Sequence, residues 1–173
     1  MNIMALVPIA FPLALATGMH FIEFKKETYK RAYLLGGVFL NFVFAMIVIS
    51  TAQPEMHIFK INDFMEIYFK VDGMSKLFLS MTSFLWICTT AYSFDYMSHE
   101  GKENKFFTYF LMTLGVVVGI SLAGNIFTFY IFYEFLTLST FPLVIHTGTK
   151  EALASGKKYL IYSFGGATLV LLG

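Results

Sequence analysis

The stretch Ile131–His146 (IFYEFLTLSTFPLVIH) carries one acidic residue, Glu134, in a mainly apolar run. A hydrocarbon core about 30 Å thick takes roughly 20 helical residues. A helix over Ile126–Ile145 therefore places Glu134 near mid-membrane. A charged residue there costs about 2.5–3.5 kcal/mol, and such residues commonly face a protein interior and serve ion or proton movement. We predict that Glu134 is a proton-binding site; the alternative is a structural glutamic acid that stays neutral.

Three other residues are candidates for the same site. Tyr130 lies four residues before Glu134 and Thr137 three after it, so both share its helical face and are expected to hydrogen-bond to it. Lys158 opens a later apolar run. It is either a relay group at the inner mouth of an ion path or an anchor whose ammonium reaches the membrane surface.

The composition indicates a multi-pass membrane protein embedded in a lipid bilayer. Of its residues 57% are hydrophobic and 13% charged, whereas soluble domains carry about 25% charged residues. The net charge of +1 gives no reason to expect nucleic-acid binding. No cofactor motif is present, and no metal site is expected, because the histidines are not spaced as ligands: His20, His57, His99 and His146.

The apolar runs predict an all-α fold with about six transmembrane helices: Ile3–Ile22, Ala32–Ala52, Met74–Phe94, Phe106–Ala123, Ile126–Ile145, and a sixth from Lys158 after a connection at Thr147–Lys157. Between the second and third helices, polar and apolar residues alternate over 57–61 and 66–71, with Asn62 and Asp63 between them. This pattern is typical of a β-hairpin, which we expect at the surface as a lid or a contact for a neighbour.

Smaller features predict how the helices are oriented and packed. Most basic residues follow the first, third and fifth runs, so the positive-inside rule predicts that the N-terminus and the hairpin are extracytoplasmic. Gly115 and Gly119 have the spacing of a close helix contact. The pair Gly124-Asn125 predicts a two-residue turn between antiparallel helices. Asn41 is expected to hydrogen-bond between helices, and Asp72 to cap the third helix.

Four motifs occur in a familiar order: VDGMS at 71–75, YS followed by YM at 92–97, FYE to LV at 132–144, and KYL at 158–160. In this order the chain resembles the antiporter-like proton-translocating membrane subunits. That family is shared by respiratory complex I, the membrane-bound hydrogenases and the multisubunit Na⁺/H⁺ antiporters. The resemblance covers the whole chain, as a single membrane domain over 1–173, and implies that these are the first six helices of a longer subunit.

The resemblance implies a role for Glu134: in the family, the equivalent glutamate is paired with a lysine on a seventh helix. It also implies neighbouring membrane subunits, a location in the cytoplasmic membrane and no redox cofactor in this chain. The leading hypothesis is a subunit that moves H⁺ or Na⁺ in a redox-driven complex, with enzyme activity uncertain for the chain itself. The alternatives are a subunit of a multisubunit Na⁺/H⁺ antiporter without redox chemistry, and a structural membrane anchor.

Overall fold

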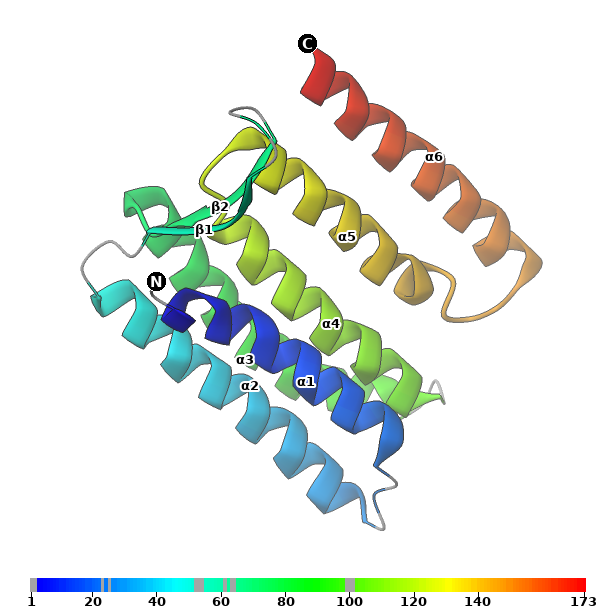
Figure 1. Cartoon of the computed structure of the whole chain (residues 1–173). Coiled ribbons are helices and arrows are strands. Elements are labelled where there is room, and N and C mark those ends of the chain that lie inside the picture. Colours follow the sequence, from blue (N-terminus) through cyan, green and yellow to red (C-terminus); the bar gives the residue numbers. More distant parts are fainter. Residues whose placement is uncertain are drawn as a thin grey trace.

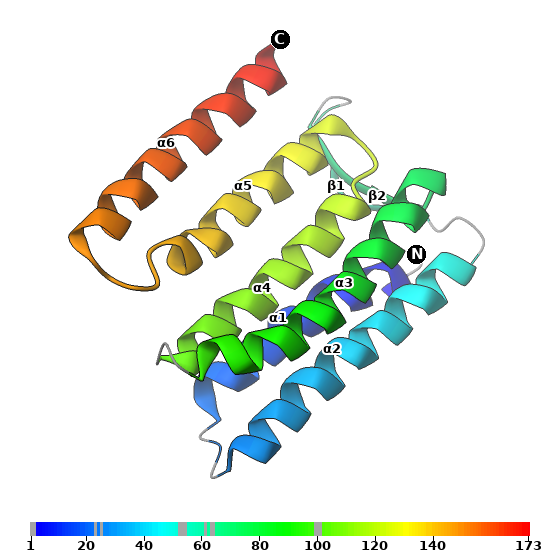
Figure 2. The same ribbon diagram turned by 180° about the vertical axis from the view of Figure 1, so that it is seen from behind.

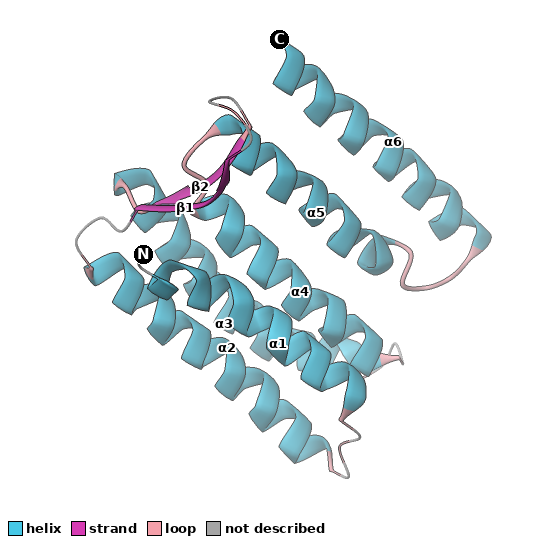
Figure 3. Cartoon of the chain, viewed as in Figure 1, coloured by secondary structure: helices cyan, strands magenta, loops and turns pink. Residues whose placement is uncertain are grey.

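A computed structural model describes residues 3–22, 24, 26–51, 55–60, 62, 65–98 and 102–173. These residues form a 3₁₀ turn, six α-helices and one pair of strands (Figures 1 and 3): η1 (Ile3–Leu6), α1 (Val7–Phe21), α2 (Glu27–Ser50), β1 (Glu55–Lys60), β2 (Glu66–Lys70), α3 (Gly73–Met97), α4 (Glu103–Ser121), α5 (Ile126–Val144) and α6 (Lys150–Leu172). The predicted all-α membrane fold with a small hairpin is therefore confirmed.

The helices pack side by side with alternating directions. α1 packs against α4, α2 against α3, and α4 against α5. α6 lies along the outer side of α5, away from α1, α2 and α3, in both views (Figures 1 and 2). Within the described residues, five segments are long and apolar enough to cross a membrane: Met4–Phe21, Glu27–Ser50, Gly73–Met97, Glu103–Ser121 and Ile126–Val144.

The sixth helix corrects the sequence-based boundaries. α6 begins at Lys150 and not at Lys158, so most of the expected connection over 147–157 is helical. The physical reason is a cap: the Thr149 hydroxyl oxygen accepts a hydrogen bond from the backbone N–H of Ala152 at 3.1 Å, and Glu151 lies in the first turn, where a negative charge favours a helix. Because the first turns of α6 are polar, a prediction from hydropathy places the start of the helix too late.

The hairpin forms where alternation predicted it. β1 and β2 pair antiparallel, with Glu55 opposite Lys70 and Lys60 opposite Glu66. Of the two residues expected between the strands, Asp63 lies outside the described residues, as does His99 further along the chain. The hairpin does not stand free: the N–H of Lys70 donates to the carbonyl of Leu122 at 2.9 Å, so β2 lies against the α4–α5 connection.

Two glycines of α4 provide the close helix packing that their spacing predicted. A Cβ at Gly115 would lie 2.8 Å from the carbonyl oxygen of Ile9 on α1, and a Cβ at Gly119 would lie 2.2 Å from the Phe132 ring of α5. Gly115 therefore allows α1 to pack closely against α4, and Gly119 allows α5 to do so. α4 is the central helix of the packing and carries many of the buried side chains.

The polar predictions have mixed outcomes. The Asp72 carboxylate caps α3 by accepting a hydrogen bond from the N–H of Ser75 at 2.8 Å, as expected. The α4–α5 connection is four residues long, from Leu122 to Asn125, and not the two-residue turn predicted. Asn41 is fully buried, but its amide makes no hydrogen bond within the described part of the chain, so the expected interhelical bond is not formed there.

Candidate functional site

The site is built on α5, whose start is fixed by Asn125. The Asn125 side-chain oxygen accepts a hydrogen bond from the N–H of Thr128 at 2.7 Å, which satisfies a backbone donor that the helix leaves free. Glu134 is the ninth residue of α5, about 12 Å from its start at roughly 1.5 Å per residue. It therefore lies near the middle of a segment long and apolar enough to span a membrane.

Both carboxylate oxygens of Glu134 are buried and accept no hydrogen bond from the described residues. A buried polar group without a partner is costly, and native structures contain few of them. The same burial favours the neutral acid over the carboxylate. Whether Glu134 holds a proton therefore depends on whether a cation or a hydrogen-bond donor comes close to its carboxyl group.

The face of α5 beside Glu134 is joined to α6 by three pairs of hydroxyl groups, which we term the hydroxyl ladder. Thr137 lies 2.6 Å from Ser163. Its two flanking pairs are Tyr130 with Thr168 at 3.3 Å and Thr140 with Tyr159 at 2.7 Å. The descending order on α6 follows from the antiparallel packing of the two helices.

The ladder determines where the predicted partners of Glu134 lie. Tyr130 and Thr137 do sit on its side of α5, one before it and one after it. Their hydroxyls also reach α6, where Tyr130 pairs with Thr168 and Thr137 with Ser163. The structure therefore places the three residues on one helix face, and the roles of Tyr130 and Thr137 as hydrogen-bond partners of Glu134 stay predictions.

A cavity of about 340 Å³ opens between α5 and α6 beside the ladder. Its wall includes Tyr130, Tyr133, Tyr162 and Ser163, so two ladder residues face it. At the other end of the helix pair, a Cβ at Gly156 would lie 2.4 Å from Ile145, and the helices are in close contact. The space between α5 and α6 thus widens towards the start of α5, and a cavity of this size with hydroxyls in its wall can hold water.

Lys158 lies on α6 next to the last rung of the ladder. Its side chain is exposed and makes no ion pair or hydrogen bond with the described residues. Thr140, whose partner Tyr159 adjoins Lys158, lies six residues after Glu134, about 9 Å along the helix axis. The structure does not bring Lys158 into contact with Glu134, and its role as a relay stays a prediction.

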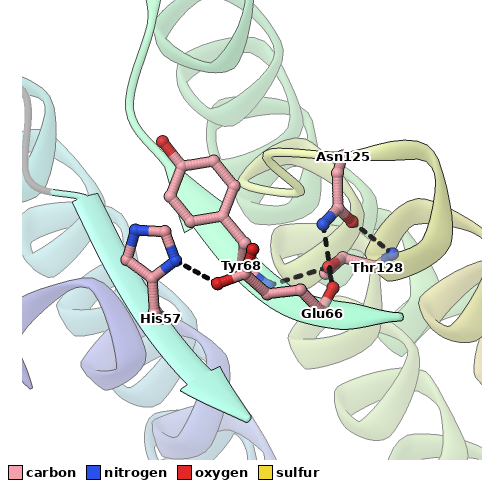
Figure 4. Close-up of polar contacts among 5 residues, drawn as sticks. All are labelled: His57, Glu66, Tyr68, Asn125 and Thr128. Carbon is pink, nitrogen blue, oxygen red and sulfur yellow. Dashed lines mark hydrogen bonds and ion pairs between the residues drawn. The ribbon is translucent and has the colours of Figure 1, made fainter. Parts of the chain in front are cut away.

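The hairpin holds the start of α5, a link that the sequence did not indicate (Figure 4). The carbonyl of Glu66 accepts hydrogen bonds from the Asn125 amide at 2.8 Å and from the Thr128 hydroxyl at 3.1 Å. The N–H of Tyr68 donates to the same hydroxyl at 2.9 Å. On the outer side, the Glu66 carboxylate contacts the His57 ring, which stacks on Tyr68. The hairpin is therefore part of the support of the helix that carries Glu134.

Sequence reasoning missed other polar groups as well. Lys30 near the start of α2 is buried and pairs with Glu27 and with Glu103 at the start of α4. Ser83 and Trp86 on α3 have buried polar atoms without a hydrogen-bond partner among the described residues. A buried lysine within reach of two acids could have been suspected from the charged helix starts, but which acids it meets depends on the helix packing. No group of three or more potential metal ligands occurs among the described residues.

Comparisons with known proteins agree with this architecture. Residues 59–107 match the family model of NADH-ubiquinone oxidoreductase (complex I), chain 5 N-terminus. The chain is 26% identical to Na⁺/H⁺ antiporter subunit A1 of Staphylococcus haemolyticus (strain JCSC1435) and 24% identical to that of Staphylococcus aureus, over 98% of its own length. It spans 22% of the length of these relatives.

The fold also matches a chain in the structure of the membrane-bound sulfane sulfur reductase, an archaeal respiratory membrane complex. The TM-score is 0.79 at 21% identity, covering 97% of this chain and 35% of that one. Together these matches support the class that the motifs predicted, the antiporter-like membrane subunits. The relatives named are subunits or members of multisubunit membrane complexes.

Proposed function

We propose that this chain forms part of an ion-translocating membrane subunit in which Glu134 binds and releases the transported H⁺ or exchanges it for Na⁺. The observation that carries the proposal is the buried, unpaired carboxyl group in the middle of α5. A neutral structural role would favour a hydrogen bond, because an unsatisfied buried acid costs stability. A translocation site instead needs a group that can change its charge.

The surroundings of Glu134 support a path towards it from the α5–α6 cavity. Tyr130 and Ser163 belong both to the cavity wall and to the hydroxyl ladder. Hydroxyl groups both donate and accept hydrogen bonds, so with water in the cavity they can pass a proton along. A cation approaching Glu134 would stabilise its charged form and release the proton; its withdrawal would favour uptake. Lys158 is the candidate relay on the side of the α5–α6 turn.

Two settings for this chemistry follow from the comparisons. The complex I family model and the respiratory complex favour a subunit driven by redox chemistry in partner subunits, which is our leading proposal. The staphylococcal relatives favour an antiporter without redox chemistry. In either setting the subunit works with other membrane subunits in the cytoplasmic membrane.

The test is Glu134→Gln in the native membrane complex, measured in inverted membrane vesicles with a pH-sensitive dye. We expect the variant to assemble, as judged by native gel electrophoresis, and to lose ion translocation. Glu151→Gln, at the exposed first turn of α6, is the matched control and should translocate as the wild type does. Full translocation by Glu134→Gln would refute the site and favour a structural anchor.

The same vesicles separate the two settings. A redox-driven complex should acidify the vesicles only after an electron donor is added. An antiporter should instead dissipate a preformed pH gradient on addition of NaCl without any donor. Loss of either signal in Glu134→Gln identifies the setting in which Glu134 acts.

A further inference from the structure

A groove between α1 and α4 has a basic, polar mouth and an apolar interior. Its mouth is a cavity of about 780 Å³, where His20 from the end of α1 meets Asn104 and Lys105 from the start of α4. The wall of the same cavity also includes apolar side chains, among them Leu13 and Met112. A site with one charged end and one apolar end fits an amphiphilic ligand.

The groove continues into a second cavity of about 460 Å³ between α1, α4 and α5. The two cavities share three wall residues, Leu13, Tyr109 and Met112, so they are adjoining parts of one surface. The wall of the second cavity is almost entirely apolar and includes Phe135 and Leu138, both exposed on α5.

The length of this groove corresponds to one leaflet of a bilayer. From Lys105 at the mouth to Val116 in the second cavity, α4 advances eleven residues, about 16 Å at roughly 1.5 Å per residue. Half of a hydrocarbon core is about 15 Å. A ligand whose head lies at Lys105 can therefore extend an acyl chain along the groove to the membrane centre.

The charge of the mouth selects an anionic head group. The described residues that line the two cavities include Lys105 and His20 but no carboxylate. The acid nearest in sequence to Lys105 is Glu103, and its carboxylate is engaged by Lys30. We propose that this groove is a binding site for an anionic phospholipid such as phosphatidylglycerol, with its phosphate at Lys105 and an acyl chain against Leu138. Basic pockets between membrane helices bind such head groups.

The test is lipid binding to the purified full-length subunit in nonionic detergent, measured by native mass spectrometry with dioleoyl phosphatidylglycerol and dioleoyl phosphatidylcholine. We expect at least fivefold tighter binding of phosphatidylglycerol. Lys105→Gln should remove most of this preference, because it removes the charge at the mouth. Leu138→Trp should weaken binding of both lipids by filling the apolar part. Lys157→Gln, at an exposed position of α6, is the control and should bind as the wild type does.

Several outcomes would overturn the proposal. Equal binding of the two lipids would exclude a head-group site. An equal loss in Lys105→Gln and Lys157→Gln would show that the preference depends only on the overall charge of the protein. Unchanged binding in Leu138→Trp would exclude the acyl groove. Displacement of the lipid by glycerol 3-phosphate alone would identify a small-anion site. Because both test residues are exposed, thermal unfolding of each variant should match that of the wild type; a lower midpoint would assign the effect to misfolding and also refute the site.

Discussion

The ion-pair cluster at the starts of α2 and α4 allows a specific test of what joins these helices. Lys30 is buried, with its side chain 6% exposed, and it contacts Glu103, 21% exposed, and Glu27, 67% exposed. Glu27 belongs to the same helix as Lys30, whereas Glu103 belongs to α4. Glu103→Gln therefore removes the charge that links the two helices and leaves Lys30 with the solvent-exposed partner.

The magnitude follows from these exposures. Removing one partner of a fully buried pair costs about 3–5 kcal/mol, whereas an exposed pair contributes about 0–1 kcal/mol. Because Glu103 is partly exposed and Glu27 remains beside Lys30, we expect Glu103→Gln to lower the free energy of unfolding by about 2 kcal/mol. Glu27→Gln should lower it by less than about 0.5 kcal/mol.

The chain contains an internal probe for this measurement. Trp86 is its only tryptophan, and its ring centroid lies 5.0 Å from that of Phe110 on α4, with the rings tilted by 33°. Unfolding in mixed micelles with increasing SDS can thus be followed by tryptophan fluorescence. Equal destabilisation by Glu103→Gln and Glu27→Gln would refute the reasoning. Lys30→Met combined with Glu103→Leu should recover much of the lost stability, since no buried charge is left unpaired.

Three other predictions use the same unfolding assay. The N–H of Ser75 holds the pKa of the Asp72 carboxyl below its usual range. The stabilisation that this cap gives the fold is therefore complete above the unfolded pKa of about 3.9 and is lost as the pH falls through the lower, folded value. Asp72→Ala should cost about 1 kcal/mol at pH 7 and less at pH 3. Gly124→Ala places a Cβ 2.3 Å from the Tyr68 ring and should cost about 1–3 kcal/mol. Thr137→Val removes a buried rung of the hydroxyl ladder and should cost about 0.6–1.7 kcal/mol.

Each of these has a control in the same fold. Asp72→Asn keeps a capping oxygen and should retain most of the stability at pH 7 while losing its dependence on acid pH. Gly36→Ala, where a Cβ meets nothing within 4 Å, should not destabilise α2. Ser163→Ala should cost as much as Thr137→Val, and the double variant no more than either; additive losses would mean that the hydroxyls do not interact.

The helix pattern could be predicted from the sequence because its signals are local. Long apolar runs, the Asp72 cap and the alternation of the hairpin strands all lie within one segment each. The start of α6 was missed because the prediction placed helix starts where the apolar runs begin. Thr149 followed by Glu151 is nevertheless a local helix-start signal. Gly115 and Gly119 predicted close packing, but which helix each one admits follows from the three-dimensional arrangement alone.

The surroundings of Glu134 depend on contacts between distant segments. Thr137 and Ser163 lie 26 residues apart, and their pairing requires the register of α5 against α6. Glu66 and Asn125 are 59 residues apart, and their contact requires the hairpin to fold back onto the α4–α5 connection. The sequence predicted the acid and its helix face, whereas the hydroxyl ladder and the hairpin support could be found only in the structure.

Burial without a partner does not by itself identify a functional group, and Asn41 shows why. Its amide is also buried in mid-helix and unpaired among the described residues, yet an amide has no charged form near neutral pH and cannot load an ion. Glu134 differs in three respects: it can carry a charge, its neighbours Tyr130 and Tyr133 on α5 face a cavity, and its helix is held at the start by a separate element. An Asn41→Leu variant should therefore leave translocation intact where Glu134→Gln abolishes it, and loss of translocation in both would mean that helix packing, and not proton binding, underlies the effect.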